Sequence, residues 1–189
     1  SYQVAPLRTM TALSINCAYA KLSQVVGLER VVALMYKMLD SEFTNPETYK
    51  IQPYASLATG ANELSPLDMA SGAQTMANGG VHLKPYFIDR IEDANGVLYQ
   101  HEQLCVAPLD VEPCRVLSSE VALRAVDTMK GVIQFGTARR TALEPAAPIG
   151  DKPRAAAGKT GTQDDNTIAW FVGYSKQLTP AVGVGDPKA

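Results

Sequence analysis

The order of helix-like and strand-like segments along the chain limits the folds open to it. Apolar residues recur at helical spacing before about residue 80, whereas three short apolar segments, 155–163, 167–174 and 180–185, occupy the C-terminal part. Short polar turns join these segments, and parallel strands would need a longer crossover, so the pattern predicts an antiparallel meander. We therefore expect an α+β domain in which an antiparallel sheet packs against a helical region.

Capping and turn residues mark the other elements. Pro6 in a first turn and Gly27 directly after the last turn bound one helix, and the N-cap Ser65 begins another. The pair Asn95-Gly96 is a strong hairpin signal. The expected elements are helices over 6–26, over 28–39 and from 65 to a stop at 78–80, a helix from Ser118 or Ser119, and a hairpin joining 86–91 to 97–100.

Composition excludes several classes of protein. The 189 residues are 46% hydrophobic and 19% charged, a mixture that can bury a core. Seventeen basic and nineteen acidic residues give a net charge of −2, so we expect no nucleic-acid partner. No apolar run approaches the roughly 18 residues of a membrane helix, and the first residues have no signal-peptide pattern.

The cysteines and histidines predict no metal site. Cys17, Cys105 and Cys114 form no C-x-x-C pair, and His82 and His101 are the only histidines, so we expect neither zinc nor another cofactor. We expect Cys17 to be a small buried residue on a helix and both histidines to be surface residues. Cys105 and Cys114 pair only if the protein meets an oxidising compartment, and the sequence leaves both states open.

The strongest chemical signal is Lys159-Thr160-Gly161-Thr162 on the first expected strand. Strand alternation places Lys159 and Gly161 on one face and the two threonines on the other. The glycine lets a ligand backbone come close, the hydroxyls suit a carboxylate, and the lysine supplies a cation or carries a proton. Taken alone, a lysine that blunts an edge strand is the commoner explanation.

The second signal is Ser14-Ile15-Asn16, inside the first expected helix. Side chains two positions apart diverge by about 200° on an α-helix. Ser14 and Asn16 therefore converge on one site only at a helix end or in a loop that enters the next helix. Taken alone, two solvent-facing polar residues are the simpler interpretation.

Together these motifs resemble part of the set S-x-x-K, S-x-N and K-T-G that is typical of penicillin-binding proteins and class A β-lactamases. The surrounding sequence resembles the transpeptidase domain of class A penicillin-binding proteins over nearly all 189 residues. The matching stretches are 11–16 with the helix up to Gly27, 65–70 through 77–80, 135–140, 157–162, Asp165-Asn166 and 169–174.

The resemblance implies the α+β fold of penicillin-binding transpeptidases and serine β-lactamases. It also implies peptidoglycan cross-linking by D,D-transpeptidation. In that reaction a serine attacks the D-Ala-D-Ala end of a stem peptide, D-Ala leaves, and an amine takes the acyl group from the acyl-enzyme. The expected partners are therefore peptidoglycan stem peptides and β-lactam antibiotics, which mimic that end.

The resemblance also assigns roles to single residues. Ser14 and Lys159 would move protons, and the Thr162 N–H would be one oxyanion donor. The substrate would lie along the 155–163 strand as an added strand, which requires an open edge there. The assigned catalytic residues are Ser14 and Lys159, and the assigned substrate-binding residues are Asn16, Thr160, Gly161 and Thr162.

The S-x-x-K motif is missing. No serine among the 189 residues is followed three positions later by a lysine. The family's nucleophile precedes the S-x-N motif, so we expect it before Ser1. Residues 1–189 would then be a partial transpeptidase domain that forms no acyl-enzyme alone. We expect the parent protein to act on the outer face of the bacterial cytoplasmic membrane, held by an N-terminal anchor outside this chain.

Two other functions stay open. A β-lactamase or D,D-carboxypeptidase on the same fold is weaker, because Thr162 and the 136–138 stretch resemble the transpeptidase pattern and no deacylating carboxylate motif stands out. A non-catalytic module that binds peptidoglycan or β-lactams would be favoured if the natural gene itself lacks S-x-x-K.

Overall fold

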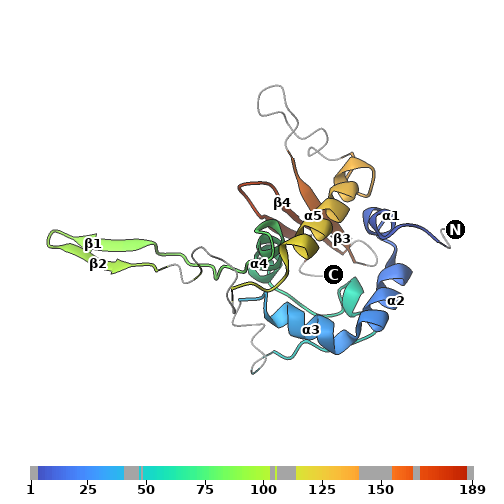
Figure 1. The fold of residues 1–189 in the computed structure, drawn as a ribbon, viewed down its shortest axis with the longest axis horizontal. Helices are drawn as coiled ribbons and strands as arrows, with labels where there is room; N and C mark the ends of the chain where they lie inside the picture. The colour runs from blue at the N-terminus through green and yellow to red at the C-terminus, as the bar shows by residue number, and fades with distance from the viewer. Residues whose placement is uncertain are drawn as a thin grey trace.

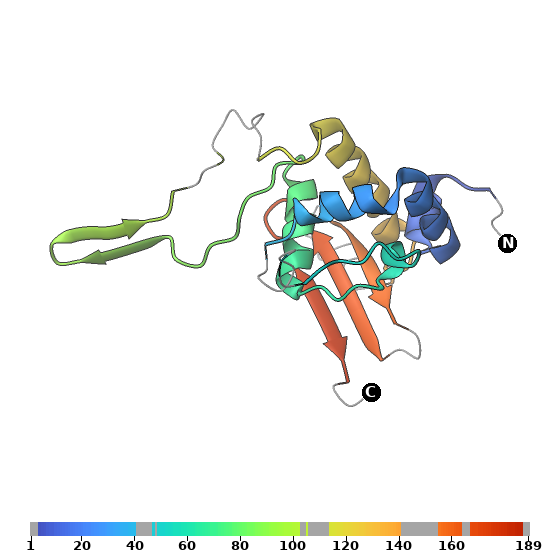
Figure 2. The ribbon, with the colours of Figure 1, turned by 90° about the horizontal axis from the view of Figure 1, so that it is seen from below.

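Helices lie on one side of a three-stranded sheet, and a two-stranded hairpin projects from this body (Figures 1 and 2). The computed structural model describes residues 4–40, 47, 49–102, 105, 114–140, 155–163 and 167–186. Its elements are α1 (Leu7–Ala12), α2 (Asn16–Val26), α3 (Leu28–Tyr36), the 3₁₀ helix η2 (Leu57–Thr59), α4 (Pro66–Ala77), β1 (Arg90–Asp93), β2 (Gly96–Gln100), α5 (Ser119–Gln134), β3 (Ala157–Thr162), β4 (Ile168–Tyr174) and β5 (Ala181–Gly185). The expected α+β class is confirmed. Asp165-Asn166 lie outside the described residues.

The C-terminal strands form the expected antiparallel meander in the order β3-β4-β5. Helix α5 packs against β3, and α4 packs against β4 and β5 (Figure 1). Ala73 of α4 is buried with Ala157 and Tyr174 of the sheet, so the core lies between these helices and the strands. Among the described strands, β3 is at one edge of the sheet.

The expected helix ends agree with the structure at α4. The Ser65 side chain accepts a hydrogen bond from the Asp68 N–H while the Asp68 carboxylate accepts from the Ser65 N–H, which forms a complete capping box. The helix ends at Ala77, and Gly79 and Gly80 follow with φ of 66° and 90°. These left-handed values explain why glycines stand at this stop.

The expectation that both histidines are surface residues is wrong for His82. Its side chain is only 15% exposed, and Nε2 lies 3.1 Å from the Asp40 carboxylate. Nδ1 lies 2.9 Å from the hydroxyl of Thr75 on α4. Ser71, also on α4, donates to Asp40 at 2.6 Å, and these hydrogen bonds lower the pKa of Asp40 although its burial opposes that shift. The network ties α4 to the segments on either side of it.

The projecting hairpin, here called the arm, comprises residues 86–102 (Figure 1). The expected hairpin is confirmed, although its turn lies at 94–95 with Gly96 already paired to Asp93, and its first strand starts at Arg90 instead of at residue 86. All nine residues of β1 and β2 are exposed, and the Tyr86 and His101 rings stack at 3.7 Å near the base. None of the helices described in the chain is both long and apolar enough to cross a membrane.

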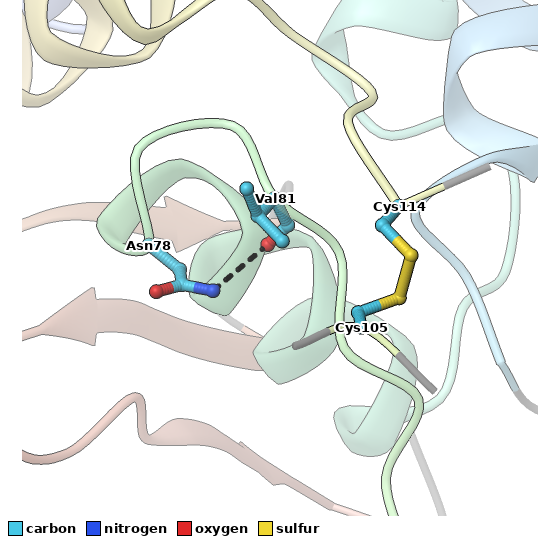
Figure 3. The surroundings of a disulfide bond; sticks show 4 residues. All are labelled: Asn78, Val81, Cys105 and Cys114. Carbon is cyan, nitrogen blue, oxygen red and sulfur yellow. Dashed lines mark hydrogen bonds between the residues drawn. A yellow bond between two sulfur atoms is a disulfide. The ribbon is translucent and has the colours of Figure 1, made fainter. Parts of the chain in front are cut away.

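A disulfide joins Cys105 to Cys114, where the chain returns from the arm to the body (Figure 3). The His82 N–H donates to the Cys114 carbonyl at 2.8 Å, so both chain segments at the base of the arm are held together. The sequence left this pair open, and the structure contains the oxidised form. Cys17, expected to be buried, is exposed on the first turn of α2.

Candidate active site

Ser14 lies at a break between two helices. The continuous helix expected over 6–26 is wrong, because α1 ends at Ala12 and α2 begins at Asn16. Ser14 has a φ of 54°, the one left-handed conformation of a non-glycine residue among those described. Such strain persists only where the surrounding contacts enforce it, and it is concentrated at functional sites. The break satisfies the condition under which the S-x-N side chains can serve one site.

Lys159 of β3 reaches this break. Its Nζ donates to the Ser14 hydroxyl oxygen at 2.9 Å and to the Thr160 carbonyl at 2.6 Å. Burial lowers the pKa of Lys159, because desolvation disfavours the charged ammonium. Since Ser14 Oγ accepts from the lysine, the serine keeps its own proton free to donate. The two residues assigned to proton transfer are therefore hydrogen-bonded although 145 positions separate them.

A pair of threonine hydroxyls extends the site. Thr160 Oγ1 lies 2.6 Å from Oγ1 of Thr137, just after the C-terminal end of α5. The Thr137 N–H donates to the Ala12 carbonyl at 3.0 Å, so this residue also contacts the end of α1. Sequence reasoning missed Thr137 as a site residue, although it stands in the 135–140 stretch that resembles the transpeptidase domain.

The hydrogen-bond pattern of the sheet directs the backbone groups of two threonines away from β4. In an antiparallel ladder, alternate residues bond to the partner strand and the residues between them point away. The Gln163 N–H donates to the Ile168 carbonyl at 2.9 Å, which sets the phase of the β3–β4 ladder. Gly161 is therefore bonded to β4, whereas the N–H and C=O groups of Thr160 and Thr162 point to the side of β3 that pairs with no other described strand, where the Thr160 carbonyl accepts from Lys159 Nζ.

The residue opposite Gly161 on β4 explains why a glycine occupies this position. Gly161 pairs with Trp170, and a Cβ on Gly161 would lie 3.1 Å from the Trp170 Cβ. Such a contact is tight, so the bare backbone leaves room for the indole and for a close ligand. Thr162 is exposed at the end of β3, and Asn16 is exposed at the start of α2, two residues after Ser14.

The structure thus brings Ser14, Lys159 and Thr160 into direct contact and places Gly161 and Thr162 along the same edge. A half-buried cation, several hydroxyls and outward-pointing N–H groups suit an extended peptide that ends in a carboxylate. Over the described residues no three His, Cys, Asp or Glu side chains gather into a potential metal site.

Comparison with known proteins identifies the family and several relatives of this chain. Residues 1–186 match the family described as "Penicillin binding protein transpeptidase domain". Penicillin-binding protein 1A of Aquifex aeolicus (strain VF5) is 37% identical over 186 residues, and penicillin-binding protein 1A of Neisseria flavescens is 36% identical over 133 residues. These alignments cover 97% and 70% of this chain but only 22% and 16% of the relatives.

The solved structures that resemble this chain in fold are also penicillin-binding proteins. Penicillin-binding protein 1A from Haemophilus influenzae superposes with a TM-score of 0.74 at 23% identity, over 95% of this chain and 30% of that one. An imipenem acyl-enzyme complex of penicillin-binding protein A from M. tuberculosis superposes with a TM-score of 0.72 at 21% identity, over 98% of this chain and 44% of that one. The shared fold is an α+β penicillin-binding transpeptidase fold.

Proposed function

The chain belongs to the penicillin-binding protein transpeptidase family, and from this premise we propose that it is part of a serine D,D-transpeptidase that cross-links peptidoglycan. The observation that carries the proposal is the hydrogen bond from Lys159 to Ser14 beside the open edge of β3. Residues 1–189 would form part of one transpeptidase domain. Its partners would be peptidoglycan stem peptides and the β-lactams that resemble their D-Ala-D-Ala ends.

The edge of β3 supports binding of the stem peptide as an added strand. Its chain would hydrogen-bond to the outward-pointing groups of Thr160 and Thr162, with Gly161 leaving room for its backbone. The hydroxyls of both threonines would hold the terminal carboxylate, and the Lys159 cation would add attraction. Asn16 would hydrogen-bond an amide of the substrate from the other side of the site.

Acyl transfer requires a nucleophile, a proton path and an oxyanion donor. The attacking serine Oγ would bond to the penultimate D-Ala carbonyl carbon, and its proton would pass through Ser14 to the D-Ala amine as the C–N bond breaks. Protonated Lys159 would keep Ser14 Oγ as an acceptor and so orient its proton. The Thr162 N–H would stabilise the oxyanion, and one such donor contributes about 3–4 kcal/mol.

The attacking serine would come from outside the 189 residues. None of their serines begins an S-x-x-K sequence, and the chain spans 22% of the Aquifex relative. We therefore propose that the nucleophile precedes Ser1 and that this chain alone forms no acyl-enzyme. The parent protein would act on the outer side of the bacterial cytoplasmic membrane, where the Cys105–Cys114 disulfide is chemically stable.

Intact mass spectrometry after incubation with benzylpenicillin tests the proposal. We expect a covalent adduct, equal in mass to the whole drug, on the full-length protein and none on this chain. A full-length adduct that hydrolyses within seconds would support the β-lactamase or carboxypeptidase alternative instead. No adduct on the full-length protein would contradict acyl transfer and favour a non-catalytic binding module.

A further inference from the structure

The Thr160 hydroxyl has a protein partner outside the K-T-G-T motif. Thr137 Oγ1 lies 2.6 Å from Thr160 Oγ1, and the two residues are 23 positions apart. Each hydroxyl carries one proton and can also accept. One of the two protons occupies the space between the oxygens, so the pair has one proton left to donate to a ligand.

The backbone around Thr137 is held by both neighbouring helices. The Thr137 N–H donates to the Ala12 carbonyl, and the Ala138 N–H donates to the Val132 carbonyl, each at 3.0 Å. A Cβ on Gly136 would lie 2.2 Å from the Ala12 oxygen, so the chain passes directly against α1 at this point. The end of α5 and the end of α1 therefore fix the position of this one residue.

The side chain of Thr137 is nevertheless accessible. Thr137 is exposed, whereas Gly136 and Ala138 on either side are buried. A fixed backbone with an accessible hydroxyl can set the orientation of another hydroxyl at low cost, because little conformational entropy remains to be lost.

We propose that Thr137 is a positioning residue of the transpeptidase site: it donates to Thr160 Oγ1 and leaves the Thr160 proton for the terminal carboxylate of the substrate. This inference rests on the proposed function, which assigns Thr160 to that carboxylate. Without the Thr137 hydroxyl, the Thr160 hydroxyl turns freely and binds the carboxylate less well. The effect falls on ligand binding and leaves the acylation step unchanged.

The test uses the full-length protein and benzylpenicillin, whose carboxylate stands for that of the substrate. Thr137→Val removes the hydroxyl at similar volume, and Thr137→Ser retains it. We expect Thr137→Val to lower the second-order acylation rate constant about 3- to 10-fold, through weaker binding at an unchanged limiting rate. Thr137→Ser is expected to restore it to within about twofold.

A double-mutant cycle with Thr160→Val separates positioning from direct contact. If Thr137 acts through Thr160, adding Thr137→Val to Thr160→Val changes the rate by less than about twofold. Full additivity of the two losses would mean that Thr137 binds the ligand itself and would overturn the proposal. Thr128→Val is the matched control: this α5 hydroxyl donates to the Arg124 carbonyl on the exposed helix surface.

Thermal melting of each variant checks folding, and Thr137→Ala replaces Thr137→Val if the latter does not fold. Equal acylation of wild type and Thr137→Val would overturn the positioning role and leave the proposed function intact. If the wild-type protein forms no adduct, the proposed function fails first and this inference fails with it.

Discussion

Lys159 combines a charge with a partly dehydrated position. Its ammonium donates to Ser14 and to the Thr160 carbonyl, while burial lowers its pKa below the ordinary value of 10.5. In the full-length protein, we expect acylation by benzylpenicillin to decrease as pH rises through this lowered pKa, because the amine then loses its charge. A pH profile of the acylation rate constant measures this alkaline limb below pH 10.5.

The variant Lys159→Arg tests whether Lys159 is the group that titrates. Arginine stays charged throughout this range, so the variant is expected to acylate more slowly at neutral pH but to lose the alkaline limb. Lys130→Arg, on the exposed surface of α5, should keep the wild-type profile. An alkaline limb that persists unchanged in Lys159→Arg would mean that another group titrates.

Ser14 allows stability and activity to be separated. Its φ of 54° costs a non-glycine residue about 1 kcal/mol, and glycine removes that cost. We expect Ser14→Gly to be about 1 kcal/mol more stable than Ser14→Ala, measured by thermal or urea unfolding. Both variants lack the hydroxyl that accepts from Lys159, so both should lose acylation to the same extent. A Ser14→Gly variant that acylates at the wild-type rate would contradict the proton-transfer role.

Sequence reasoning named residues that the structure brings together, but it did not predict their geometry. The motifs named Ser14, Lys159 and Thr160, because the order of short polar motifs is visible without a fold. The break at Ser14 was not predicted, since the apolar spacing of 6–26 continues through it and serine is an unusual residue for the left-handed position that ends a helix. Thr137 was missed because its partner lies 23 positions away and an isolated threonine carries no pattern.

At the scale of elements, one glycine sets how closely α1 and the end of α5 approach. A Cβ on Gly136 would lie 2.2 Å from the Ala12 carbonyl oxygen, a backbone atom that cannot turn away. We expect Gly136→Ala to destabilise the full-length protein by about 1–3 kcal/mol. It should also reduce acylation, because it displaces Thr137.

Gly72→Ala is the control, and it is expected to change the free energy of unfolding in the opposite direction. Gly72 lies inside α4, and its added Cβ would meet only the Met38 Cε, at 4.0 Å. Alanine in a helix interior gains up to about 1 kcal/mol over glycine, so this variant should unfold at the same or a higher denaturant concentration. Equal stability of Gly136→Ala and Gly72→Ala in urea unfolding would contradict the close packing of α1 on α5.

Element boundaries were predictable wherever local chemistry sets them. The capping box at Ser65 and the hairpin turn just before Gly96 are stabilised by contacts within a few residues, so helix α4 starts where expected and the hairpin turns within one residue of the expected place. Burial was less predictable, because it depends on neighbours far along the chain. On α5, for example, Val121 is 51% exposed, whereas Val132 is fully buried.

For the molecule as a whole, helices α4 and α5 pack against the sheet, but its last strand keeps apolar side chains in solvent. Val172 of β4 packs with the core beneath α4 and α5, and Phe171 packs against Val132, Ile133 and Ala138 at the end of α5. Val182 and Val184 of β5, the register partners of Phe171 and Ala169, are 53% and 67% exposed. An exposed apolar patch on a sheet whose last strand is at its edge favours association.

We therefore expect this 189-residue chain, prepared alone, to self-associate and to be poorly soluble. Threonine keeps the β-branched shape of valine and adds a hydroxyl, so the double variant Val182→Thr/Val184→Thr should reduce association without unfolding the sheet. Analytical ultracentrifugation measures the size distribution, and thermal melting checks the fold. Val32→Thr is the control. Val32 is buried, so this substitution should lower the stability of the fold without improving its solubility. A monodisperse, cooperatively melting sample of the unaltered chain would contradict the association expected from the exposed valines.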